Sequence, residues 1–471
     1  MSNQAELEAK TQQVSDEASL IPSGETILEQ IGINSATVKA MKGGTKRSYY
    51  RAVINWLTKY KANSDASNLE KVKGLLEAFY HLCEVEDWKK ANAILTTSLN
   101  TPLKEKVHTQ LGIWGYYKEQ IRFSNLILGK VDIKTDAIYL SCLGHTYRNL
   151  GEYQLAIDFN QQAWAIAKKV DDRQGESRIL CSLGLVYQRI AEYQIAINHF
   201  QEAFSIAQKI HDLEAQVSIL IGLGNTHINL GQYQLAIDFY QQALIISREI
   251  HNVWRESLIL GNLGRVYNEI GEFNQAISFL KESLTIVEKI GDRRSQANAL
   301  GNLGYSYTRL GQLDQAIYYF QLNLAIAREI GDLPTESITL GNLGNISFIK
   351  KDYQSAIGFL QQHLMLAQKI GDRFGESVSL NNLGKTFIHI DKYEEALVSL
   401  KDSLKIASEI GDSTGTVYNF VYLAELYYKT NQSQLAREHC EKALQIATEL
   451  GIPLVKECQE LLQQIETNDR N

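Results

Sequence analysis

The stretch Leu260–Leu280 reads LGNLGRVYNEIGEFNQAISFL, and close versions of it begin at Leu300 (LGNLGYSYTRLGQLDQAIYYF) and at Leu340 (LGNLGNISFIKKDYQSAIGFL). Each copy starts forty residues after the previous one. A phrase that returns in strict register marks an internal repeat, in which each copy forms one supersecondary unit that stacks on its neighbours. The phrase therefore predicts a repeat protein. It also raises the question of whether its asparagine serves the fold or a partner.

Three columns of near-constant residues follow this forty-residue period. The first holds Leu followed by a small residue, the second holds Ala, and the third holds Ile or Leu. Three columns in one register leave little room for chance. The columns run from Leu143-Gly144 to Leu423-Ala424, from Ala156 to Ala436 and from Ile166 to Ile446.

Each period contains two helical patterns joined by a tight corner such as LGEY or IGEF. Apolar residues recur at spacings of three and four on both sides of the corner, which predicts a helical hairpin. Gly144 and Ala156 remove side-chain bulk where the two helices must approach closely, and Tyr147 and Tyr153 fill the wider gaps. Departures from the columns are local: His227 and Ser347 replace an aromatic residue, and Ala424 replaces the glycine.

The segments between hairpins carry their own helix signals, in phrases such as GDRR, GDLP, GDRF and GDST. The glycine suits the left-handed residue that ends a helix, and the aspartate can accept hydrogen bonds from the free amides of the next helix. The pairs that end one helix and cap the next are Gly291-Asp292, Gly331-Asp332, Gly371-Asp372 and Gly411-Asp412.

The pattern of Leu263-Gly264, Tyr267, Ala276 and Ser283 resembles the tetratricopeptide repeat. The forty-residue length and the GNLG phrasing are similar to the longer variant found in Leu-Gly-Asn-rich spindle-orientation adaptors, in kinesin light chain and in many cyanobacterial proteins. The resemblance implies an all-α fold, a right-handed α-solenoid of stacked helical hairpins, the tetratricopeptide superhelix.

Four regions are expected along the chain. Residues 1–40 are predicted to be a flexible N-terminal segment, and residues 41–130 a degenerate helical region with two hairpin-like stretches. That region also resembles the connector that precedes such repeats in cyanobacterial signalling ATPases of the STAND type. Residues 131–450 are predicted to form eight tandem hairpins, and residues 451–471 a C-terminal capping helix and tail.

Composition argues against several classes of function. The formal net charge of -7 gives no broad basic surface, so a nucleic-acid partner is not expected. The 5 cysteines lack metal-ligand spacing, so we predict neither a metal site nor a disulfide framework. No signal peptide or long apolar stretch is present, which predicts a cytoplasmic protein without membrane insertion.

No motif supports catalysis or a cofactor. Gly384-Lys385-Thr386 has Ser379 where a phosphate-binding loop requires glycine, and it lies within a predicted helix. The histidines lie in different repeats without a paired nucleophile. We therefore expect no enzyme and no cofactor.

The resemblance implies that the first helix of each hairpin lines a concave groove for a partner, and it places the residues flanking the Leu-Gly column in that groove. An asparagine amide has both donors and an acceptor, so a row of asparagines can match the backbone of an extended peptide. A polar residue merely tolerated on a wet wall is the alternative. The row before the column holds Asn262, Asn302, Asn342 and Asn382, and the row after it holds Asn225, Arg265, Tyr305, Asn345 and Lys385.

Further cations, Arg148, Arg189 and Arg309, lie on the same helices. They would suit acidic residues of a protein or peptide partner, although long cations on helices also cover apolar surface. We predict a scaffold or adaptor that binds an extended or helical peptide segment in its groove. Two alternatives stay open: a regulator related to STAND-type ATPases that docks through residues 40–130, and a Rap-like regulator of a response regulator.

Overall fold

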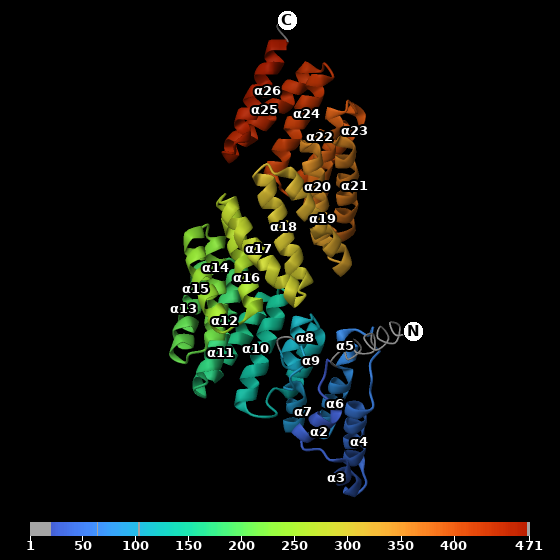
Figure 1. The fold of residues 1–471 in the computed structure, drawn as a ribbon, viewed down its shortest axis with the longest axis vertical. Helices are drawn as coiled ribbons and strands as arrows, with labels where there is room; N and C mark the ends of the chain where they lie inside the picture. Colours follow the sequence, from blue (N-terminus) through green and yellow to red (C-terminus); the bar gives the residue numbers. More distant parts are fainter. Residues whose placement is uncertain (1–19, 64, 102–103, 469–471) are drawn as a thin grey trace, which may run out of the picture. The chain divides into compact units, whose positions relative to one another are not determined.

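The computed structural model describes residues 20–63, 65–101 and 104–468. Within them all named elements are helices, and one isolated β-bridge joins Ser98 to Lys106. Figure 1 shows the chain as a succession of helices, which confirms the predicted all-α solenoid of stacked hairpins. Two compact units divide the chain, Met1–Ile246 and Ser247–Asn471.

The first unit begins with short helices and continues as regular hairpins, and its last helix runs on into the second unit. The short helices are α2 (Gly24–Gln30), α3 (Ser35–Ala40), α4 (Thr45–Thr58), α5 (Asn68–Lys71), α6 (Lys73–Glu84), α7 (Trp88–Leu95), α8 (Val107–Ile113) and α9 (Tyr117–Ile127). The hairpin helices are α10 (Ile133–Asn149), α11 (Tyr153–Lys169), α12 (Arg173–Arg189), α13 (Tyr193–Lys209), α14 (Leu213–Asn229) and α15 (Tyr233–Glu249).

The second unit repeats the hairpin pattern and ends in a further helix. Its elements are α16 (Val253–Glu269), α17 (Phe273–Ile290), α18 (Arg293–Arg309), α19 (Leu313–Ile330), α20 (Leu333–Ile349), α21 (Tyr353–Ile370), α22 (Arg373–His389), α23 (Tyr393–Glu409), α24 (Ser413–Lys429), α25 (Ser433–Leu450) and α26 (Leu454–Asn468). We call the even-numbered members from α10 to α24 first helices and the odd-numbered members from α11 to α25 second helices.

We expected residues 1–40 to be flexible, and residues 1–19 of this segment lie outside the described residues. From residue 20 onward it is helical and packed: Ile27 is fully buried, and Ile31 and Val38 are almost so. These side chains join the core formed by α4, α6 and α7. Burial of apolar surface gives this stretch a physical reason to be ordered, which the polar N-terminal sequence concealed.

Helix contact at the Leu-Gly column depends on the missing side chain. A Cβ added to Gly304 would lie 2.8 Å from the ring of Phe320, and one added to Gly384 would lie 2.5 Å from Cγ of Leu400. Ala424, which occupies the glycine column in the last hairpin, belongs to the same buried cluster as Cys440. Because Cys440 occupies the column of Phe320 and Leu400, a smaller partner accompanies the larger residue there.

The corner after each first helix requires a left-handed backbone. Gly231 has a φ of 70°, and a residue with a side chain, Ala191, adopts a φ of 62° at the equivalent position. Between hairpins, Gly291 and Gly331 end their helices in the left-handed conformation. The aspartate after each of the four predicted glycines then caps the next helix, accepting a hydrogen bond from the backbone N–H three residues on.

Replacing Ala191 by glycine is expected to raise the free energy of unfolding by about 0.5–1 kcal/mol, because a side chain disfavours the left-handed conformation. Gly231→Ala should lower the free energy of unfolding by a similar amount. No atom lies within 4 Å of the added Cβ, so the change acts only through the backbone conformation. Urea midpoints measure both changes. Ala165→Gly, on the exposed face of α11, is the control and should destabilise by about 1 kcal/mol. A destabilised Ala191→Gly variant would contradict this reading.

Overpacking at the glycine column can be tested with a pair of substitutions. Gly384→Ala should lower stability by about 1–3 kcal/mol through its clash with Leu400. Leu400→Cys alone should also destabilise, because it empties part of a fully buried position. The double variant copies the Ala424 and Cys440 pair, and we expect it to lose less stability than the sum of the single changes. Strictly additive losses in thermal unfolding would show that the two positions do not share one space.

Candidate functional site

The first helices of the second unit contact one another in sequence, from α16 through α18, α20 and α22 to α24. We call the accessible side chains of these helices the first-helix face. The predicted asparagine row lies on it, with one member on each of the first four helices, and all four side chains are half-buried: Asn262, Asn302, Asn342 and Asn382.

The four asparagines differ in their hydrogen bonds. The Asn302 amide donates to the carbonyl oxygen of Asn298, 2.9 Å away, so part of its capacity serves its own helix. Within the described part of the chain, the side chains of Asn262, Asn342 and Asn382 have no hydrogen-bond partner. Three of the four amides therefore keep donors and an acceptor available to a ligand.

The first glycine of the GNLG phrase has a packing role that the sequence did not reveal. A Cβ at Gly341 would lie 2.8 Å from Nδ1 of His363, and one at Gly301 would lie 3.4 Å from Nδ2 of Asn323. Both opposing side chains are buried. In these two repeats, both glycines and the leucine of the phrase thus serve packing, and the asparagine alone faces outward.

A cavity of about 750 Å³ opens among α18, α20, α22 and α24. Four predicted residues line it: Arg309, Asn345, Asn382 and Lys385. Sequence reasoning missed its apolar lining, because those side chains come from three helices and only Val378 and Tyr418 share a column. The missed residues are Phe348, Ile349, Phe374, Val378, Tyr418 and Tyr422. Its volume and mixed lining are typical of a pocket that binds an apolar group among a few polar contacts.

Lys385 is the cation at the centre of this lining. Its Nζ lies 4.6 Å from the ring centroid of Phe348 and 5.3 Å from that of Tyr422, so two aromatic rings hold the ammonium group. Burial lowers the pKa of Lys385, and the negative charges of Glu425 and Glu457 only partly oppose that effect. The folded protein therefore bears a cost for keeping this charge here.

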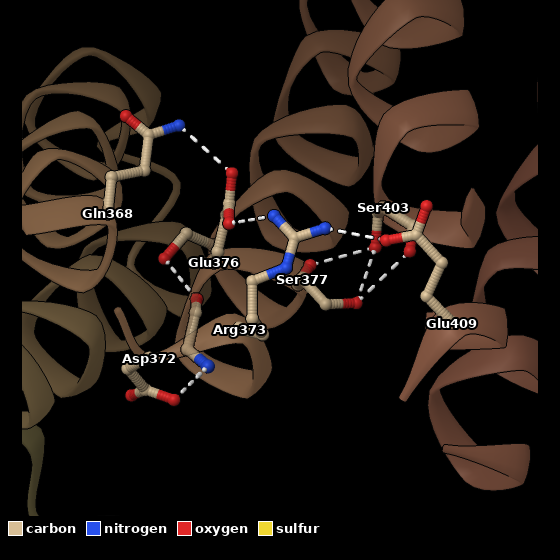
Figure 2. Close-up of polar contacts among 9 residues, drawn as sticks. Gln368, Asp372, Arg373, Glu376, Ser377, Ser403 and Glu409 are labelled. Carbon is tan, nitrogen blue, oxygen red and sulfur yellow. Dashed lines mark hydrogen bonds and ion pairs between the residues drawn. The ribbon is translucent and has the colours of Figure 1, made fainter. Parts of the chain in front are cut away.

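Several arginines elsewhere in the chain are paired with carboxylates. Figure 2 shows Arg373 between two of them, with Glu376 at 2.5 Å and Glu409 at 2.7 Å. Arg328 likewise bonds Glu336 at 2.7 Å. In contrast, among the described residues the predicted groove cations form no ion pair with a carboxylate. These cations are Arg148, Arg189, Arg265, Arg309 and Lys385.

The remaining predicted residues are distributed over both units. Asn225 accepts a hydrogen bond from the Tyr240 hydroxyl at 2.6 Å, so its carbonyl oxygen already has a partner within the hairpin. Tyr305 is 42% exposed, and the Arg309 guanidinium lies 5.9 Å from its ring centroid. Arg148, Arg189 and Asn225 belong to the first unit, and the other predicted residues belong to the second.

Two searches of the described residues bear on other kinds of site. They contain no group of three or more His, Cys, Asp or Glu side chains that could hold a metal ion. Over the same residues, no helix combines the length and apolar character needed to cross a bilayer.

Hairpins stacked at a forty-residue period, with an exposed row of first helices, define a helical repeat protein. The tetratricopeptide repeat model matches residues 135–209, 216–289, 295–369 and 335–409, which together make up more than half of the chain. The chain belongs to the tetratricopeptide repeat family, as the GNLG pattern predicted. No protein among the curated sequences matches it.

Several solved structures are similar in fold. A STAND signal-transduction ATPase with a tetratricopeptide repeat sensor from Pyrococcus horikoshii shares 15% identity over 96% of this chain and 70% of its own, with a TM-score of 0.53. Aspartyl phosphate phosphatase F from Bacillus subtilis shares 15% identity over 82% of this chain and 96% of its own, with a TM-score of 0.50. Kinesin light chain-like repeats from Podosopora anserina share 18% identity over 42% of this chain and 96% of theirs, with a TM-score of 0.36.

Replacing Lys385 by methionine is expected to raise the thermal midpoint at pH 7. Burial lowers the pKa of Lys385 in the folded state, so the unfolded chain binds the proton more tightly and the charged form opposes folding. Methionine keeps the contacts with Phe348 and Tyr422 and removes the charge. The gain should shrink as the pH rises toward the ordinary lysine pKa, because the wild-type lysine then loses its proton as well.

Lys401→Met is the matched control, because Lys401 is exposed on the second helix of the same hairpin. Its thermal midpoint should stay close to that of the wild type. If Lys385→Met instead lowered the midpoint, the contact of the ammonium with the two rings would outweigh the cost of burying it.

Proposed function

We propose that this protein is a protein-interaction scaffold that binds a partner segment along the first-helix face of its second unit, and that the segment carries acidic residues. The observation that carries the proposal is the difference between its cations. Arg373 and Arg328 are paired with carboxylates, whereas the predicted groove cations of the second unit are not. These groove cations are Arg265, Arg309 and Lys385. Lys385 is the partly buried one of the three. An unpaired cation in such a position weakens the fold, and a carboxylate from outside would offset that cost.

The neutral side chains of the face suit a peptide backbone. Asn262, Asn342 and Asn382 belong to a row with one asparagine in each of four repeats, and their amides have no partner among the described residues. Each can donate to a carbonyl oxygen and accept from an N–H of an extended or helical segment. Their regular spacing favours contact with the main chain, which is the same at every residue of a ligand, over contact with particular side chains.

The cavity adds a means of selecting the ligand. Phe374, Val378 and Tyr418 form an apolar lining that can hold one bulky side chain of the segment. Lys385 lies in the same lining and can receive a neighbouring carboxylate. Membership in the tetratricopeptide repeat family supports a role in protein interaction, because stacked repeats present an extended surface.

The proposal can be tested with peptides selected from a random display library on the full-length protein. Selected sequences should be enriched in Asp and Glu next to a bulky apolar residue. In fluorescence anisotropy, changing Asn262, Asn342 and Asn382 together to Ala should weaken binding by about 0.5–1.5 kcal/mol per lost hydrogen bond. Asn302→Ala should cost less, because that amide already donates to its own helix.

Two comparisons control for indirect effects. Asn274→Ala removes an exposed amide from the second helix α17 and should leave affinity unchanged. Lys385→Gln and Arg309→Gln should weaken binding of acidic peptides and reduce its dependence on salt. Unchanged affinity in a well-folded triple asparagine variant would contradict groove binding. If the selected peptides then bound residues 40–130 instead, docking through the N-terminal region would replace this proposal.

A further inference from the structure

A second cluster of unpaired polar groups lies in the first unit, around Arg148 on α10. In two other repeats the equivalent position holds a side chain that reaches the next first helix. Gln188 donates to Oγ1 of Thr226 at 2.9 Å and to the carbonyl oxygen of Gly222 at 3.4 Å. Asn268 makes the corresponding contacts within the second unit, with the Ser306 hydroxyl at 2.7 Å and the Asn302 carbonyl oxygen at 3.3 Å. A polar side chain at this position can therefore connect consecutive repeats.

Arg148 does not make this connection. The residues at the same offsets on α12 are Ser182 and Val186, and Arg148 has no hydrogen bond to either among the described residues. Its side chain donates only to the neutral Oδ1 of Asn149, at 3.4 Å. The Ser182 hydroxyl is buried and has no partner in the described structure. Two groups that can donate hydrogen bonds thus remain without a strong acceptor on the facing sides of α10 and α12, which pack together.

The charge around this cluster is positive. Burial lowers the pKa of Arg148, and Cys181 partly opposes that shift. The positive charge of Arg189 lowers this pKa further, and Tyr117 has the smallest effect. Burial also lowers the pKa of His145 to about 4, with Arg148 contributing, so this imidazole is neutral near pH 7. None of the groups that shift these two pKa values is a carboxylate. Among the described residues, neither the Arg148 nor the Arg189 guanidinium forms an ion pair with a carboxylate.

We infer that Arg148, Arg189 and Ser182 form an oxyanion site on the first unit, and that its ligand is a phosphoryl group. Two guanidinium forks and one hydroxyl offer more donors than the two oxygens of a carboxylate can use, whereas a phosphoryl group presents three acceptor oxygens and up to two charges. The partly buried position of Arg148 strengthens such contacts, because solvent screens them less. This site does not depend on the asparagine row and goes beyond the proposed function.

The inference can be tested by titrating the full-length protein with inorganic phosphate at constant ionic strength and following ³¹P transverse relaxation. Phosphate should relax faster in the presence of protein. Arg148→Gln should reduce affinity by roughly tenfold or more, the loss expected for hydrogen bonds to a charged group. Arg189→Gln should reduce it less, because Arg189 is the more exposed of the two. Arg148→Lys should be intermediate, since it keeps the charge and loses the planar fork.

Arg51→Gln is the matched control. It removes the same charge from an exposed arginine of α4 and should leave phosphate binding unchanged. Equal loss in Arg148→Gln and Arg51→Gln would mean that phosphate responds only to net charge, and would overturn the site. Absence of relaxation enhancement in the wild type would also overturn it. Circular dichroism and the thermal midpoint check that each variant is folded.

Two further ligands identify the source of the oxyanion. Phosphoserine that binds more tightly than inorganic phosphate would support a phosphorylated partner segment, and the reverse order would support free phosphate. Acetate that competes as strongly as phosphate would assign the site to carboxylates and overturn the phosphoryl assignment. The asparagine triple variant should bind phosphate like the wild type, so failure of this inference and failure of groove binding can be told apart.

Discussion

Close approach of two helices at the Leu-Gly column is the constraint on which the rest of the structure depends. At Gly264, Gly304 and Gly384 the space that a Cβ would need is already filled by a side chain of the second helix. That contact fixes how near the helices lie, and the next hairpin packs on the result. In the last hairpin, the larger Ala424 is paired with the smaller Cys440. This pairing indicates that the repeats preserve the combined volume of the two side chains more closely than the identity of either one.

The same constraint decides which side chains of the first helix are available to a partner. Leu263 and Gly264 face the second helix, and successive residues of an α-helix are rotated by about a quarter turn, so the residues on either side of this pair lie at the edge of the contact. Asn262 is therefore half-buried and Arg265 is exposed. Because this packing contact recurs every forty residues, the residues beside it form a row of equivalent polar positions, and no other feature of the sequence is needed to align them.

Charge divides the molecule into two kinds of surface. Arginines near the ends of helices bond carboxylates of their own or a neighbouring helix and so help to hold consecutive elements together. The predicted groove cations form no ion pair with a carboxylate among the described residues, and burial lowers the pKa of both Lys385 and Arg148. A protein selected for stability alone would pair or remove such charges. We propose instead that each binds an anionic group of a ligand.

The sequence by itself determined the period, the hairpins, the caps and the family, because each depends on contacts within one repeat that recur in fixed register. It also located the asparagine row. Only the tertiary structure decided which of those amides are unpartnered, that Gly341 makes room for His363, and that residues from residue 20 onward join a core. The cavity around Lys385 and the cluster at Arg148 likewise required the structure. Their side chains converge from different helices, and such convergence depends on packing geometry that no single column of the repeat records.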